Sequence, residues 1–254
     1  MAGRLLRRVA LACLGPALML GLGCNNILGP SKVDANWRSY PGLHFMLYVR
    51  PGSFAETNQA LLAAVLDDQF ATTLARLEIA YGGRISVFLY DSAADASLDS
   101  DRSGMGYPDT EAIRGTCAPP LDESLVRLLA HESNHVIQRN AMGLPGTSFM
   151  SEGLASAVMS ARFYPIGNDR LWAWTASRGA ALPAVSTLIA GGAWDGDDTT
   201  ASASFLAYLL DRAGPAPIRQ MYQLRSEDLP ARMRTLYGRS LEDLERDWRA
   251  FCGK

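Results

Sequence analysis

Apolar residues follow helix-like and strand-like spacing in the first half of the chain. Between residues 54 and 81 they recur every three or four positions, which predicts one long helix. The segments 44–49 and 85–90 are short, rich in β-branched and aromatic residues, and bounded by glycine or proline, so both are predicted strands. Residues 91–110 scatter Asp among Ser and Ala, and we expect a loop with a solvated acidic surface there.

The chain becomes predominantly helical after Pro119-Pro120. Amphipathic spacing predicts helices over 121–139, 151–162, 170–177, 183–190, 199–212, 216–224 and 240–251. The order of elements predicts an α+β fold in a single domain over 43–251. Its parts are a small α/β half over 43–118, with a mixed or antiparallel sheet, and a helical half over 119–251.

The first two dozen residues have the pattern of an export signal. Three arginines precede an uncharged apolar stretch over 9–22, which is short for a membrane span but typical of a signal peptide. The stretch ends at Cys24, in a context that resembles a bacterial lipobox. We therefore expect a signal peptide over 1–23, a lipid anchor on Cys24, and a tether over 24–42. The alternative is an ordinary cleaved signal with a chance cysteine. Either way we expect an exported protein of the cell envelope, facing the periplasm or the cell surface.

Composition excludes some classes of function and leaves the cysteines open. With 24 basic and 26 acidic residues the formal net charge is −2, so we expect no nucleic-acid partner. Beyond Cys24, the chain retains Cys117 and Cys252. In an oxidising compartment they could form a disulfide, and they could equally be two buried free thiols.

The motif that carries chemistry is His131-Glu132-Ser133-Asn134-His135, within the predicted helix 121–139. Residues four apart lie on one face of a helix, so both imidazoles can reach one tetrahedral metal ion. Glu132 then lies where its carboxylate can approach a water on that metal. The spacing is typical of a zinc hydrolase, with Glu132 as general base.

A catalytic zinc site needs a third protein ligand and an open position. His44 is the one other histidine, and its place in an apolar strand favours a partly buried structural role. The third ligand is therefore expected to be a carboxylate. Glu152 follows His135 after a turn containing Gly143 and Pro145, and a helix–turn–helix can bring it opposite the two histidines.

These residues resemble a known family. The box, a turn and then Glu-Gly-Leu-Ala are similar to the gluzincin zinc metallopeptidases, in particular the bacterial peptidase MA-like domain. The resemblance covers about 43–251, is most specific over 125–155, and extends to 204–214 and 240–248.

The resemblance implies a zincin-like fold with one zinc ion held by His131, His135 and Glu152. It also implies a peptide or protein substrate, and a general-base role for Glu132. The protein would then be a metallohydrolase, most simply a peptidase.

The chain departs from the family pattern where other side chains assist catalysis. Ser156-Ala157 and Thr199-Thr200 occupy regions where the family commonly has tyrosine, a donor that stabilises the oxyanion. Ser156 also stands near the place of an Asp that orients a zinc histidine in relatives of thermolysin. These departures motivate a second hypothesis, a catalytically degenerate zinc-binding lipoprotein that acts as a binding or scaffold module. A hydrolase for another amide or ester is a third.

Overall fold

In the part of the chain that the structure describes, the N-terminal half is a five-stranded mixed sheet with helices packed against it. The computed structural model describes residues 37–92, 94–95, 105–107, 111–121, 123–159, 169–191 and 195–253. The strands are β1 (Arg38–Pro41), β2 (Phe45–Val49), β3 (Ile85–Tyr90), β4 (Met105–Tyr107) and β5 (Ala112–Thr116). Their order is β1-β2-β3-β5-β4, with β2, β3 and β5 parallel and both edge strands antiparallel. The predicted α+β class and mixed sheet are confirmed.

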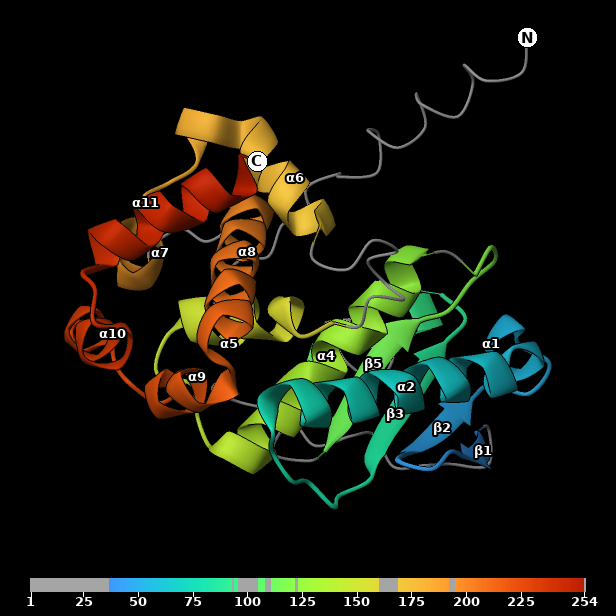
Figure 1. The fold of residues 1–254 in the computed structure, drawn as a ribbon. Helices are drawn as coiled ribbons and strands as arrows, with labels where there is room; N and C mark the ends of the chain where they lie inside the picture. The colour runs from blue at the N-terminus through green and yellow to red at the C-terminus, as the bar shows by residue number, and fades with distance from the viewer. Residues whose placement is uncertain are drawn as a thin grey trace, which may run out of the picture.

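Alternation along the central strands sends apolar side chains to a helix-covered face. Leu47, Val87 and Ile113 are in register on the three parallel strands and are fully buried. They pack in one core with α2 (Gln59–Leu77) and α4 (Glu123–Met142), which lie across this face in Figure 1. This packing fixes the orientation of α4, so the histidine motif on that helix is held by the sheet.

The helices that follow α4 form a second core around α8. They are α5 (Ser148–Ala157), α6 (Asp169–Arg178), α7 (Val185–Ala190), α8 (Gly196–Ala213), α9 (Pro215–Met221), α10 (Leu229–Tyr237) and α11 (Leu241–Cys252). Residues 201–210 of α8 are all buried, and α5 and α11 pack against this helix (Figure 1). Among the described residues, no helix is long and apolar enough to cross a membrane.

The structure corrects several predicted elements. Strand β1 lies inside the stretch 24–42 predicted as a tether. The last residues of that stretch therefore belong to the sheet. Strand β4 interrupts the predicted loop 91–110. The predicted helix 54–81 is divided at Asn58 into α1 (Phe54–Thr57) and α2, and it ends at Leu77. The proposed signal peptide and Cys24 lie outside the described residues.

The two remaining cysteines are separate buried thiols. Cys117 and Cys252 are both free, and they lie in different cores, one beneath the sheet and one among the C-terminal helices. Burial raises the pKa of Cys117 to about 11, with the charge of Asp91 adding to the effect. Of the two alternatives for this pair, the structure therefore has the free thiols.

Candidate metal centre

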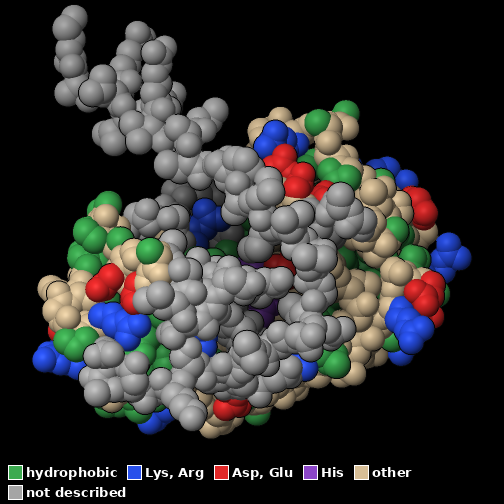
Figure 2. All heavy atoms as spheres, turned by 180° about the vertical axis from the view of Figure 1, so that it is seen from behind, with side chains coloured by type: hydrophobic (Ala, Val, Ile, Leu, Met, Phe, Trp, Pro, Cys, Tyr) green, Lys and Arg blue, Asp and Glu red, His purple; other side chains and the backbone are tan. Residues whose placement is uncertain are grey.

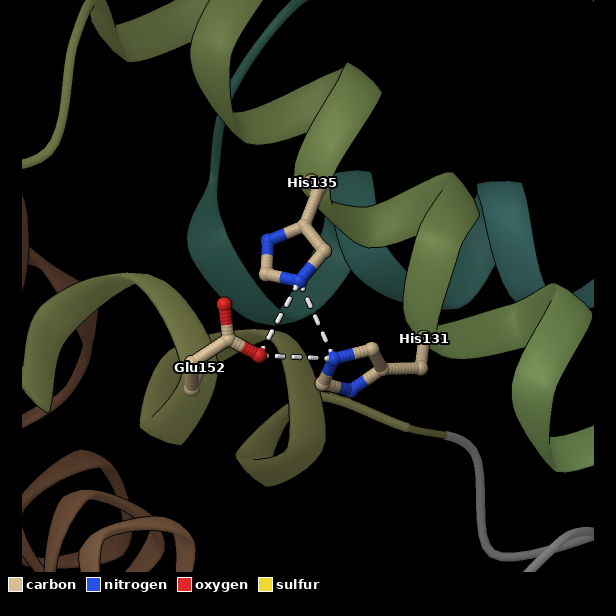
Figure 3. A group of neighbouring side chains, drawn as sticks. All are labelled: His131, His135 and Glu152. Carbon is tan, nitrogen blue, oxygen red and sulfur yellow. Dashed lines mark hydrogen bonds and ion pairs between the residues drawn. The ribbon is translucent and has the colours of Figure 1, made fainter. Parts of the chain in front are cut away.

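Helix α4 presents His131 and His135 on the side that faces the second core. Leu125, Leu129 and Val136 of the same helix pack beneath the sheet. The histidines, one turn apart, project from α4 toward α5 (Figure 3). Their Nε2 atoms are 3.0 Å apart and the rings meet edge to face. The i, i+4 spacing therefore places both imidazoles at one point, as predicted.

Helix α5 carries Glu152 to the same point. Thr147 caps the N-terminus of α5 by accepting a hydrogen bond from the backbone N–H of Met150. The turn before it uses Gly143 with φ of +87°, a conformation that glycine adopts without strain. The helix begins at Ser148, before the predicted start at 151, so Glu152 lies one turn inside it.

The three side chains form a triangle that fits one metal ion. Oε2 of Glu152 lies 3.1 Å from Nε2 of His131 and 3.4 Å from Nε2 of His135 (Figure 3). Ligand atoms around a tetrahedral zinc are expected about 3.3 Å apart, because the bonds to zinc are about 2.0–2.2 Å long. The observed edges lie close to that value, so the three atoms could hold one metal ion of this size.

The site remains accessible from one side. The side chains of His131 and His135 are 12% and 14% exposed, and that of Glu152 is 30% exposed. In Figure 2, histidine side chains are visible in a hollow near the centre of the face, beside an acidic side chain. Among the described residues, these three are the one group of His, Cys, Asp and Glu suited to a metal. No fourth His, Cys, Asp or Glu among the described residues joins this group.

Charge is concentrated around the triangle. Burial disfavours a charged His135, but the carboxylates of Glu152 and Glu132 outweigh burial and raise the pKa of His135 to about 9. For Glu152, burial alone would raise the pKa, but His135 and His131 lower it far below the usual range. Both shifts favour the charged forms, a protonated His135 beside an ionised Glu152, at the point where the three ligand atoms converge.

Glu132 lies beside the triangle without being part of it. It is buried, and its charge acts on His135, although it is not one of the three converging ligands. This placement is compatible with the general-base role expected from the sequence.

Two hydroxyl groups of α5 contact the outer nitrogens of the histidine rings. Oγ of Ser156 is 3.1 Å from Nδ1 of His131, and Oγ of Ser151 is 3.4 Å from Nδ1 of His135. With Nε2 left free for a metal ion, Nδ1 would carry the ring hydrogen and donate a hydrogen bond to the hydroxyl. Such contacts fix the ring orientation and tautomer of a metal-ligating histidine. Ser156 thus occupies the position at which the family resemblance placed an orienting Asp.

The residue after Glu152 is glycine for a packing reason. A Cβ added to Gly153 would lie 2.7 Å from Cβ of Ser202 and 3.0 Å from Cδ1 of Leu206, both on α8. Helices α5 and α8 therefore approach more closely than any other residue would allow. Through this contact the helix that carries Glu152 packs directly against α8, at the centre of the second core.

Other side chains considered from the sequence have structural roles. The ring of His44 stacks on Phe70 with the centroids 4.0 Å apart, away from the triangle. Asp195 caps α8 and forms a capping box with Asp198.

Sequence reasoning missed three residues near the site. These are Ser151, the buried Asn134 between the two histidines, and Tyr222, whose phenol is within electrostatic range of Glu152. Asn134 and Ser151 adjoin predicted ligands in the sequence, and that was the one signal available. Tyr222 is distant in the sequence and had none.

Comparisons with known proteins add no family assignment. No protein-family model matches the chain, and the search of curated proteins finds no match.

Proposed function

We propose that this protein is a zinc-dependent metallohydrolase, and specifically a peptidase with a peptide or protein substrate. The observation that carries the proposal is the triangle of His131, His135 and Glu152, whose edges match a single tetrahedral zinc. Glu132 next to this triangle supports hydrolysis rather than metal storage. The likeness to gluzincin peptidases adds the substrate class.

The exposed side of the triangle favours a catalytic over a structural zinc. Structural sites are closed by four protein ligands, whereas catalytic sites keep one position open. Three ligands converge here among the described residues, and the carboxylate ligand is partly exposed. A bound zinc would polarise the substrate carbonyl and lower the pKa of its water to about 7.

The residues around the site would then have separate roles in the reaction. Glu132 accepts the proton of the attacking water at its carboxylate and returns it to the leaving amine. Ser156 and Ser151 hold the histidine rings in the tautomer that leaves Nε2 free for the metal. Gly153 allows α5 to pack closely against α8, and this packing holds Glu152 in position.

The test is a digest of a peptide library by the purified mature protein, with its metal content measured in the same sample. We expect one zinc per chain and cleavage in the wild type. Glu132→Gln should keep the zinc and lose cleavage by about 10²–10⁴-fold, the usual contribution of a general base. His131→Ala should lose the zinc itself. Zinc without Glu132-dependent cleavage would instead support the scaffold hypothesis, and hydrolysis of esters alone would support the third.

We also propose that the protein is exported and anchored in the cell envelope through Cys24. The support is the arginine-led apolar stretch ending in this cysteine. In cell fractionation, the wild type should accompany membranes, and Cys24→Ser should be released into the soluble envelope fraction. Equal distribution of the two proteins would contradict the anchor.

A further inference from the structure

Asn134, the residue directly before His135 in the histidine motif, joins three helices. Its side-chain Oδ1 accepts hydrogen bonds from the hydroxyl of Thr73 and, at 3.1 Å, from Nε2 of Gln69, both on α2. Its Nδ2 donates to the carbonyl oxygen of Ala155 on α5 at 2.6 Å. Gln69, Thr73 and Asn134 have no exposed surface. One buried amide therefore connects the helix of the two histidines to the helix of Glu152 and to the α/β half.

The bond to Ala155 is well placed to set the spacing of the metal ligands. Ala155 lies three residues after Glu152, nearly one helical turn, and Asn134 immediately precedes His135. Ala155 is in the last turn of α5, where carbonyls lack partners within the helix. Gln69 donates in the same way to the carbonyl of Val158, at 3.4 Å. The C-terminal end of α5 is thus held by side chains from two other helices.

A buried polar network fixes distances that apolar packing leaves adjustable. Apolar side chains tolerate small sliding movements, whereas a buried amide left unpaired costs the full desolvation of its polar atoms. Asn134 can satisfy its three partners at only one spacing of α2, α4 and α5. Metal sites require their ligands within about 0.5 Å of the productive geometry.

We propose that Asn134 is a positioning residue for the metal centre: through Ala155 it sets the distance between the histidine pair and Glu152. Thr73 and Gln69 hold the amide in the orientation this requires, so the α/β half takes part in metal binding. The inference rests on the proposed zinc function, because its effect is exerted on zinc affinity. It assigns no chemical step to Asn134.

The test is zinc affinity, measured by competition with a chromophoric chelator at fixed pH. Asn134→Asp keeps the shape and the acceptor but loses the donor to Ala155, and Asn134→Leu loses the whole network. Each should weaken zinc binding by about 10–100-fold, the range found when groups that support metal ligands are removed. Thr73→Val removes one donor and should have a smaller effect in the same direction. If an Asn134 variant does not fold, the zinc affinity of Thr73→Val still tests the inference.

Two control variants separate positioning from simple loss of stability. Ser133→Ala removes a fully buried hydroxyl that donates to Leu129 within the same helix, so it should leave zinc affinity unchanged. Leu244→Ala creates a cavity in the second core at α11, which packs on α6, α7, α8 and α10, and should lower the melting temperature while keeping zinc affinity. All affinities are compared below the melting temperature of each metal-free protein, with near-ultraviolet circular dichroism to confirm folding.

The outcomes distinguish this inference from the function on which it rests. The positioning role alone would be overturned if Asn134→Asp, Asn134→Leu and Thr73→Val all bound zinc as tightly as the wild type. An equal loss of zinc affinity in Leu244→Ala would also overturn it, because zinc affinity would then follow stability. A wild type that binds no zinc would contradict the metal centre itself, and the positioning role with it.

Discussion

The close contact between Gly153 and α8 predicts how strongly a larger side chain at this position would destabilise the protein. In Gly153→Ala the new methyl group would lie 2.7 Å from Cβ of Ser202, 3.0 Å from Cδ1 of Leu206 and 3.2 Å from the carbonyl carbon of Ser202. Carbon atoms pack best about 3.5–4.0 Å apart, so α5 and α8 must separate by roughly 0.5–1 Å. Because Glu152 is the preceding residue, this movement displaces a metal ligand.

The energetic cost combines two opposing effects. Overpacking a core costs about 1–3 kcal/mol, while replacing a helical glycine by alanine gains about 0.5–1 kcal/mol. We expect a net loss of about 1–2 kcal/mol in the free energy of unfolding, and a fall of about 2–8 °C in melting temperature. Zinc affinity should fall as well, because the carboxylate moves away from the histidines.

The assay is thermal unfolding and zinc titration of a double-mutant cycle. Ser202→Gly removes the Cβ that the new methyl group meets, and with it a buried hydroxyl that has no hydrogen-bond partner among the described residues. The double variant should therefore recover zinc affinity relative to Gly153→Ala, and should be more stable than the sum of the single changes predicts. Strictly additive effects, or full affinity in Gly153→Ala, would refute the close-approach argument.

Further predictions concern charge, orientation and thiol access. With chelator present, the His135–Glu152 ion pair should contribute stability that is complete at pH 6.5 and lost as pH rises through about 9, the raised pKa of His135; thermal unfolding across this range tests it. With excess zinc the trend should reverse, because metal replaces the proton, and parallel pH profiles would contradict the shared site. Ser156→Ala should weaken zinc binding about 10-fold in a chelator competition, whereas unchanged binding would remove its orienting role. Cys117 and Cys252 should both resist a thiol reagent in the native protein and react after unfolding; a mass increase without unfolding would argue against their burial.

The sequence predicted the strongly patterned elements and missed the weakly patterned ones. Helices α4 and α8 and strand β3 have long or dense apolar patterns, and each was expected close to its observed place. Strand β1 has four residues without a buried side chain, and β4 has three residues, so neither carries a periodic signal. Helix α10 buries only Leu229 and Met233, which is too little to establish helical spacing.

The candidate ligands were predictable because their spacing is local. The step from His131 to His135 is one helical turn, and Glu152 follows after a recognisable turn. The supporting groups were not predictable in the same way. Asn134 needs Thr73 and Gln69 from a helix that is distant in the sequence, and no local rule pairs them. Tertiary packing brings these partners together.

The most direct test of the central claim is X-ray absorption spectroscopy at the zinc edge of the purified mature protein. The account predicts one four-coordinate zinc bound by nitrogen and oxygen only, with two imidazoles, one carboxylate and one exchangeable solvent oxygen. His135→Ala should abolish this spectrum, and Ser133→Ala should preserve it. A zinc with sulfur ligands, a site closed by four protein ligands, or a protein that retains no zinc would contradict the account.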